Sequence, residues 1–569
     1  MGSRCPSRGE TMSNERMPVP GRPRAAAHRL PLPLLLALLA QALGCTSSST
    51  VPAGPALDPD TVRFLEQSTF GPTEVLATHV QQVGFSGFID EQLAVPPSSL
   101  GDYAVVLQGP AQVCPTGSPA NCYRDNFTGF LPAVQFFHNA VSGEDQLRQR
   151  VAFALGQILV VSAEDVPTTY GIADYQTLLL DGALGNFRQL LESVTLSPAM
   201  GRYLNMVNND KPNPDAGTNP NENYARELLQ LFSIGLVQLR ADGTVVTTDG
   251  GAPVPTYDQG VVEGFAHVFT GWTYPTLPGA TLKTHNPVYY RGPMEVVASN
   301  HDGAAKALLG GVTLPAGQTP QKDLSDALDL VFQHPNLGPF IGRQLIQFLV
   351  TSNPSPAYVA RVSAVFADDG TGVRGNLAAV VRTILLDPEA RGAAKTDPAY
   401  GKLREPALLI AGLARALGVQ TDGVYPRNAC AAVGQDVFQA PSVFNFYPPN
   451  APLPGTSLLS PPSVLFDSTT ALSRSNVVYT LLFSKVAPDA TIAGATGTVA
   501  PLTDLASSAG DAGALADRLD ALLMHRTMSA GMRSAVLSAV NAVPASDPVG
   551  RVRAAAYVIA TSAQYQVER

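Results

Sequence analysis

The chain lacks the short signatures of the common enzyme classes. It contains no HExxH motif, no GxSxG elbow, no GxxxxGK[ST] phosphate loop and no GxGxxG after a strand. These absences argue against a standard zincin protease, an ordinary α/β-hydrolase and a common nucleotide enzyme. The sequence therefore names no reaction by motif, and any site has to be found from local chemistry.

Cysteine is scarce, and its spacing excludes two kinds of cofactor site. No CxxC pair and no CxxCH is present, so a four-cysteine zinc site and a c-type haem are excluded. Cys114 and Cys122 close a short loop rich in Pro and Gly, which predicts a local disulfide in an oxidising compartment. Cys430 is left over, and we expect it to be buried or unpaired.

Charge and long hydrophobic runs are also limited. Charged residues make up 15% of the chain and hydrophobic residues 45%, as in a globular protein. After residue 45 the chain carries 31 basic and 44 acidic residues, a net charge of −13, which argues against binding nucleic acid or adhering directly to anionic lipid. No stretch after the leader approaches the roughly 18 apolar residues of a membrane-spanning helix.

The N-terminus has the design of a secretory signal. Arg22, Arg24 and Arg29 precede a short apolar run at 30–43 that ends at Gly44 and Cys45. This arrangement is similar to a bacterial lipoprotein cleavage box, in which Cys45 would be lipidated and residues 46–56 would form a polar tether. An ordinary signal peptide cleaved nearby is the alternative. Either way we expect export to the cell envelope, and a lipoprotein with this sequence is expected at the outer membrane.

The remaining residues, 57–569, predict one large multi-helical domain of the mainly α class, with at most a few short strands. Residues 511–569 are expected to pack back on it as C-terminal helices. Residues 243–248 are the best candidate for a strand. Loops are expected at 102–128, 205–221, 272–320 and 422–460, and loops this long usually serve a function. Helical periodicity and stop signals predict helices at 61–68, 72–82, 86–93, 146–161, 175–184, 187–196, 222–235, 261–271, 323–332, 338–350, 357–366, 377–386, 403–417, 514–523, 530–543 and 549–562.

Several blocks occur in the order found in one known family. They include RFLEQSTFGPT, QLRQRVAFALGQILVVS, PNENYARELLQLFSIGL, HDGAAKALLG, KLREP, APSVFNFY and the terminal SAQYQVER. The chain resembles the bacterial family catalogued as domain of unknown function 1800. The resemblance implies an exported protein, often encoded beside a sulfatase- or phosphatase-like protein, and implies no reaction or cofactor. Val261, His267 and Ala304 depart from the family pattern, so no role is assigned to them.

The most distinctive chemistry lies where a loop rich in Asn, Asp, Pro and Gly enters a helix at Glu222. Irregular, oxygen-rich backbone at a helix start can hold cations, anions or polar substrates. Glu222 and Arg226 are four residues apart and can pair. Glu227 lies about 140° from Glu222 around the helix, so the two cannot chelate one ion from this helix alone. The alternative interpretation is a capped amphipathic helix with one ion pair.

His301 and Asp302 are the natural partners from elsewhere in the chain. A His beside a carboxylate on irregular backbone suits acid–base catalysis or a metal. The alternative is a helix start capped by Asp302. We therefore select Glu222, Glu227, His301 and Asp302 as candidate catalytic residues, with Glu227, His301 and Asp302 as candidate ligands of a divalent metal ion, and expect them to converge on one polar cleft.

Two functions from different classes follow from these observations. One is an exported enzyme acting on an envelope or extracellular substrate through that polar or metal site. The other is a non-catalytic, lipid-anchored envelope scaffold or assembly partner of the co-encoded sulfatase- or phosphatase-like protein, with the same residues serving as structural networks.

Overall fold

The computed structural model describes residues 57–569, which belong to one compact unit. The predicted signal peptide, the lipidation of Cys45 and the tether at 46–56 lie outside the described residues. Within the described part, no helix combines the length and the hydropathy that crossing a bilayer requires.

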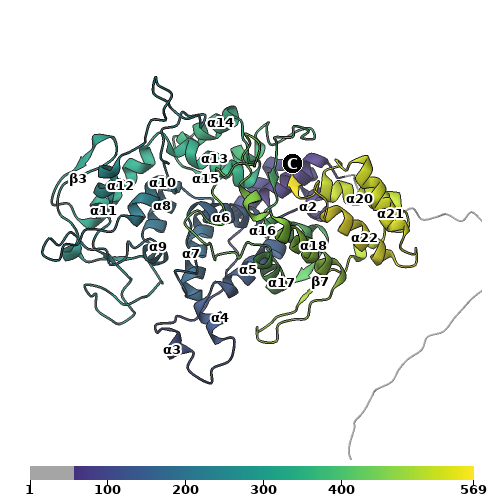
Figure 1. The fold of residues 1–569 in the computed structure, drawn as a ribbon, viewed down its shortest axis with the longest axis horizontal. Coiled ribbons are helices and arrows are strands. Elements are labelled where there is room, and N and C mark those ends of the chain that lie inside the picture. Colours follow the sequence, from purple (N-terminus) through teal and green to yellow (C-terminus); the bar gives the residue numbers. More distant parts are fainter. Residues whose placement is uncertain (1–56) are drawn as a thin grey trace, which may run out of the picture. The chain divides into compact units, whose positions relative to one another are not determined.

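The fold is mainly α, as the sequence predicts (Figure 1). Its strands are all two residues long in the described chain. The first part of the chain forms α1 (Pro59–Ser68), α2 (Glu74–Ala94), α3 (Pro110–Val113), α4 (Cys122–Phe127), α5 (Phe130–Ser142) and α6 (Gln146–Ile158). The middle forms α7 (Thr169–Gly182), α8 (Phe187–Thr195), α9 (Pro198–Tyr203), α10 (Asn223–Gln230), α11 (Gln259–Val268), α12 (Pro320–Gln333), α13 (Leu337–Leu349), α14 (Pro356–Ala367) and α15 (Leu377–Leu386).

The last part contains α16 (Pro406–Ala416), α17 (Val424–Ala432), α18 (Ser468–Phe483), α19 (Thr503–Ala506), α20 (Ala512–Met524), α21 (Ala530–Asn541) and α22 (Pro548–Ala560). Short 3-10 turns lie at η1 (Ala298–Asn300), η2 (Leu309–Gly311) and η3 (Pro461–Leu465). The strands form four antiparallel pairs: β1 (Trp272–Thr273) with β2 (Glu295–Val296), β3 (Lys306–Ala307) with β4 (Thr313–Leu314), β5 (Lys402–Leu403) with β8 (Val567–Glu568), and β6 (Gln420–Thr421) with β7 (Thr498–Val499).

Many helices begin where a capping side chain meets a proline. Asp58, Thr319 and Ser355 accept hydrogen bonds from the first turns of α1, α12 and α14, and each is followed by Pro at the first helical position. α2 covers both helices predicted at 72–82 and 86–93. Gly84, with φ of 76°, interrupts its helical backbone between them, so the predicted break is present as a kink.

The structure corrects several predicted loops. The region 102–128 contains α3 and α4, and the region 422–460 contains α17. α5 and α18 lie where no helix is predicted, because their Phe, Ser, Thr and Val residues have low intrinsic helix propensity and tertiary packing overrides it. The candidate strand at 243–248 forms only isolated bridges, among them Leu239 with Val245 and Thr247 with Pro253.

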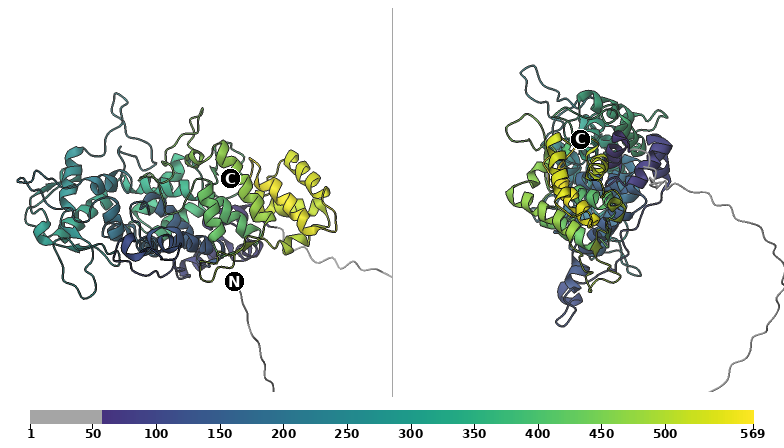
Figure 2. Two further views of the ribbon diagram at one scale, coloured as in Figure 1. Left: turned by 60° about the horizontal axis from the view of Figure 1, so that its bottom comes forward. Right: turned by 90° about the vertical axis from the view of Figure 1, so that its right-hand side faces the viewer.

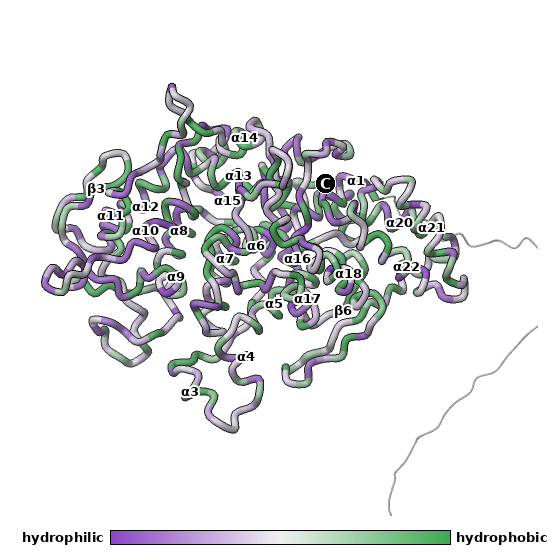
Figure 3. Tube along the Cα trace, in the orientation of Figure 1, coloured by the Kyte–Doolittle hydropathy of each residue, from purple (hydrophilic) through white to green (hydrophobic). Residues whose placement is uncertain are grey.

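The hydrophobic core is built largely from the middle helices. Figure 3 marks hydrophobic stretches along α13 and the second half of α6, and side chains of both helices belong to the largest buried cluster. A second cluster joins α18, α20, α21 and α22 to the end of α16. The C-terminal helices, yellow in Figure 2, therefore pack on the rest through α18, α16 and α1.

Cys114 and Cys122 form a disulfide between the end of α3 and the start of α4. Cys430 is free and fully buried in α17, and its burial raises the pKa of its thiol. The described cysteines therefore include one bridged pair and one enclosed thiol.

Candidate functional site

The loop at 205–221 packs against two other irregular segments. The side chain of Asn209 accepts a hydrogen bond from the Asn221 N–H at 2.8 Å, and its backbone carbonyl accepts one from Gly271 at 2.8 Å. The Lys211 N–H donates to the Asn300 carbonyl at 2.8 Å. Hydrogen bonds of the Asn209 side chain therefore join the predicted loop to the start of α10, and backbone hydrogen bonds join it to Gly271 and to the segment before His301.

Glu222 precedes the first residue of α10 and links this helix to α11. Its Oε2 accepts hydrogen bonds from Arg226 Nη2 at 2.6 Å and from Gln259 Nε2 at 2.9 Å. The pair with Arg226 has the spacing that the sequence predicts. Both side chains are partly exposed, so the pair stabilises the helix only modestly.

Glu227 lies on another side of α10 and forms no ion pair with a basic side chain of residues 57–569. Its Oε2 is buried and accepts no hydrogen bond within the described chain. Burial raises the pKa of this carboxyl, and the charge of Arg226 opposes that effect in part. Its electrostatic neighbours are Tyr203 and Tyr257, and the hydroxyl of Tyr257 is likewise buried without a partner. The Glu227 carboxyl can therefore hold a proton more readily than an exposed glutamate.

His301 is enclosed in a buried charged cluster. Its Nε2 lies 2.9 Å from Asp323 Oδ2, and its Nδ1 lies 2.9 Å from the Thr270 carbonyl. Lys306 Nζ lies 2.7 Å from the same Asp323 oxygen. At Gly271, with φ of 82°, an added Cβ would come within 2.9 Å of His301, so only glycine admits this close approach. Both ring nitrogens of His301 thus have protein partners.

Asp302 points toward α11 and not toward α10. One carboxylate oxygen contacts His267 Nδ1, and the other accepts a hydrogen bond from the Ala304 N–H at 2.9 Å. Burial alone would raise the pKa of Asp302, but the N–H of Ala304 and the ring of His267 together lower it. The Asp302 carboxylate is therefore held as an anion by its own neighbours.

The four predicted site residues thus fall into separate hydrogen-bonding groups. Within residues 57–569, no three or more His, Cys, Asp or Glu side chains are placed so that they could hold a metal ion, so Glu227, His301 and Asp302 do not form such a group. The physical reason is that His301 and Asp302 are each engaged by nearer partners, Asp323 and His267. Their convergence with Glu227 on one cleft stays a prediction.

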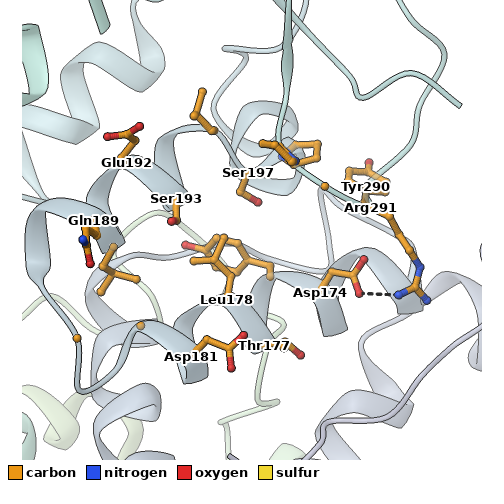
Figure 4. Close-up of a pocket in the computed structure, with 18 of the residues that line it drawn as sticks. Asp174, Thr177, Leu178, Asp181, Gln189, Glu192, Ser193, Ser197, Tyr290 and Arg291 are labelled. Atoms are coloured by element: carbon orange, nitrogen blue, oxygen red, sulfur yellow. Dashed lines mark hydrogen bonds and ion pairs between the residues drawn. The ribbon is translucent and has the colours of Figure 1, made fainter. Parts of the chain in front are cut away.

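A cleft of about 930 Å³ lies elsewhere, between α7 and the α8–α9 segment (Figure 4). α7 contributes Asp174, Thr177 and Asp181 to it, and α8 contributes Gln189, Glu192 and Ser193. Tyr290 and Arg291 close one side. α8 can present these polar groups because Phe187, Leu191 and Val194 are buried away from the cleft.

Among the carboxyl groups that line this cleft, that of Asp174 has a clearly raised pKa. Its partial burial raises the pKa to about 6; the charge of Arg291 opposes the shift, and that of Asp102 adds to it. Arg291 Nη1 lies 3.4 Å from Asp174, whereas Arg291 Nη2 lies 2.8 Å from Asp102. Since the arginine is shared and closer to Asp102, Asp174 is only weakly compensated. It can therefore exchange a proton near neutral pH.

Several other polar side chains in the cleft have no protein partner. Asp181, Gln189, Ser193 and Thr177 make no side-chain hydrogen bond or ion pair within residues 57–569. Glu192 is held by Arg188 at 2.6 Å. The cleft thus presents free donors and acceptors to whatever enters it.

Asp174 and Asp181 were not selected from the sequence. They are seven residues apart, which places them on one face of α7, and that spacing is the signal that could have found them. The predicted helix at 175–184 begins after Asp174, so the residue falls outside it. The burial of Asp174 has no local sequence signal. Its contact with Arg291 has none either, because the two residues are 117 positions apart in the chain.

Neither a curated protein nor a solved structure matches this chain. The match to a family covers residues 63–567, nearly all of the described chain, and includes the helices of the cleft and of the predicted site. The chain belongs to the family described as proteins of unknown function, DUF1800.

Proposed function

We propose that the protein is exported and held at the bacterial envelope, at the outer membrane, by a lipid on Cys45. The Arg-rich and Leu-rich leader before Cys45 supports this location, and so does the disulfide between Cys114 and Cys122, which persists in oxidising compartments. Mass spectrometry of the membrane fraction should find Cys45 as a diacylglyceryl-modified N-terminus. An unmodified N-terminus at another residue would remove the lipid anchor and leave export in place.

For its activity, we propose hydrolysis of glycosidic bonds in an envelope or extracellular polymer bound in the cleft between α7 and α8. The observation that carries this proposal is the weakly compensated Asp174 carboxyl, with a pKa of about 6, on the same helix face as the free carboxyl of Asp181. A pair of carboxyls with unequal environments is what acid–base hydrolysis of a glycoside needs. The unpaired Gln189, Ser193 and Thr177 suit a ligand rich in hydroxyl groups.

The two carboxyls take different roles in this reaction. Protonated Asp174 donates its proton to the leaving glycosidic oxygen as the carbon–oxygen bond breaks. Asp181 accepts a proton from the attacking water, whose oxygen bonds to the anomeric carbon. Arg291 positions Asp174 without fully neutralising it, because it is shared with Asp102.

The helix sets the separation of these groups. Seven residues at 1.5 Å per residue place the two Cα atoms roughly 10 Å apart along α7. Inverting glycosidases leave a wider gap between their carboxyls than retaining ones, so that a water fits between base and sugar. We therefore expect the reaction to invert the anomeric configuration.

The test is the release of new reducing ends from soluble glycans, including peptidoglycan strands and neutral polysaccharides, by the purified protein. Asp174→Asn and Asp181→Asn should each lower the rate at least 100-fold. Asp249→Asn is the matched control, because Asp249 is exposed on the loop at 237–255, outside the cleft. Failure of the wild-type protein to cleave any glycan of the panel, or activity retained in both cleft variants, would contradict the proposal.

One surface favours a second function, that of an assembly partner. α18 exposes Leu472, Tyr479 and Phe483 by 65%, 53% and 38%, at positions i, i+7 and i+11 of one helical face. Tyr479 and Phe483 stack with ring centroids 4.8 Å apart. An exposed apolar stripe of this kind is typical of a protein-binding surface.

For this second function we propose the co-encoded sulfatase- or phosphatase-like protein as the partner, since the family resemblance implies such a neighbour. Co-expression followed by size-exclusion chromatography should give one complex. The double variant Leu472→Ser and Tyr479→Ser should raise the dissociation constant of the complex at least tenfold. Val75→Ser, at another exposed apolar residue, should leave it unchanged. Independent elution of the two wild-type proteins would contradict this assembly.

A further inference from the structure

An apolar groove of about 410 Å³ lies where α13 faces the loop after α10 and the segment at 444–459. Its wall includes Leu236, Val245 and Phe444, which expose 56%, 38% and 43% of their surface. Exposure of three large apolar side chains around one hollow costs hydration free energy. A groove of this volume lies within the range of small-molecule sites.

One face of α13 forms the floor of the groove. Phe340, Arg343, Gln344 and Gln347 line it at positions i, i+3, i+4 and i+7. Gly235, with φ of 72°, lies against Phe340, since a Cβ there would come within 2.7 Å of the ring. Any larger residue at 235 would displace Phe340, so the backbone at Gly235 packs directly against the floor of the groove.

Among the described residues that line the groove, Arg343 carries the only charged side chain. It makes no hydrogen bond or ion pair within the described chain. Burial lowers the pKa of its guanidinium, and no acidic side chain contributes an opposing shift. A partly desolvated cation beside apolar walls is unfavourable until an anion approaches it.

We propose that this groove binds an anionic amphiphile, a monocarboxylate with an unbranched apolar chain, whose carboxylate pairs with Arg343. The guanidinium offers two parallel donors that match a carboxylate. Leu236, Val245 and Phe444 cover the apolar chain and lose their exposure to water. The groove is separate from the cleft between α7 and α8, so this inference does not depend on the proposed hydrolysis.

Isothermal titration calorimetry with decanoate, decanol and decylammonium tests the proposal on the wild-type protein. Decanoate should bind at least tenfold more tightly than decanol, and decylammonium should bind most weakly. Equal affinity for the acid and the alcohol, or no binding of decanoate at millimolar concentration, would overturn it. This comparison needs no variant and is independent of any effect on folding.

Variants locate the site. Arg343→Gln should weaken decanoate at least tenfold and leave decanol unchanged, and Phe444→Ser should weaken both. Arg533→Gln is the matched control, because Arg533 pairs with Asp517 on α20 and belongs to α21, which lies apart from α13 in Figure 1.

Vesicles of an anionic phospholipid test whether the anion that binds Arg343 is a lipid headgroup or a free carboxylate. Binding of vesicles without binding of free decanoate would overturn the assignment to a free amphiphile.

Discussion

Arg404 Nη2 and Glu66 Oε1 lie 2.7 Å apart in the protein interior and join α1 to the segment before α16. The other oxygen of Glu66 lies 2.8 Å from His525, at the end of α20. One buried carboxylate thus connects the first helix to two parts of the C-terminal region. Its charge is compensated by both partners, which is the condition for burying it.

Glu66→Gln should therefore destabilise the protein. Burial opposes the charged form of Glu66, but Arg404 and His525 outweigh it and lower the pKa to about 2. The lowered pKa stabilises the folded protein at pH values above 4.5, the pKa of Glu66 in the unfolded chain. This stabilisation is lost as the pH falls from about 4.5 toward 2. Urea denaturation at pH 7 should show a loss on the order of 3 kcal/mol. The loss should shrink at pH 3.

Glu164→Gln is the control for this substitution, since Glu164 is exposed. It should change the free energy of unfolding by less than about 0.5 kcal/mol. An equally small effect of Glu66→Gln at pH 7 would show that the buried pair does not stabilise the fold.

Asp174→Asn should raise stability while removing the proposed activity. Because the pKa of Asp174 is raised to about 6, the folded protein binds more protons than the unfolded chain between pH 3.8 and 6. The native state therefore loses stability as the pH rises through this window. After allowance for its partial exposure, the asparagine variant should gain roughly 1 kcal/mol at pH 7 and little at pH 4.

Thermal unfolding at the two pH values measures this difference. The same purified samples serve for the glycan assay, so stability and activity are compared directly. A variant that is less stable than wild type at pH 7 would indicate that the contact between Asp174 and Arg291 is structural.

Glu227→Gln tests the site predicted from the sequence. Burial raises the pKa of Glu227, and its Oε2 has no hydrogen-bond partner within the described residues, so loss of its charge should not weaken the fold. We expect the free energy of unfolding at pH 7 to change by less than about 1 kcal/mol. If Glu227 serves a site, ligand or metal binding should be lost without a change in stability. A loss of a few kcal/mol without any effect on binding would make Glu227 a structural residue.

Thiol labelling should separate the three cysteines at 114, 122 and 430. In the folded, oxidised protein a maleimide should label none of them, since Cys114 and Cys122 are bridged and Cys430 is buried with a raised pKa. A reductant should expose Cys114 and Cys122, and only denaturant should expose Cys430. The bridge closes a short loop, so its reduction should cost about 2 kcal/mol. Labelling of Cys114 or Cys122 before reduction would contradict the bridge, and labelling of Cys430 in the folded protein would contradict its burial.

Local sequence patterns predict the fold class and most of the helices correctly. Apolar periodicity and the cap–proline pairs at Asp58 and Ser355 are local signals, and they act within a few residues. The pairing of Glu222 with Arg226 follows from the same local geometry. α5 and α18 escaped prediction because their stability comes from burial against other helices and not from their own composition.

Which side chains contact one another depends on how distant segments pack. His301 contacts Asp323 and Thr270, and Asp302 contacts His267. Packing places the α11 and α12 regions, and not α10, against these two residues. The partial burial of Asp174 and the isolation of Arg343 likewise depend on segments far away in the chain. A pKa or an unpaired charge is set by desolvation and by distant neighbours, and neither is encoded in the residues beside it.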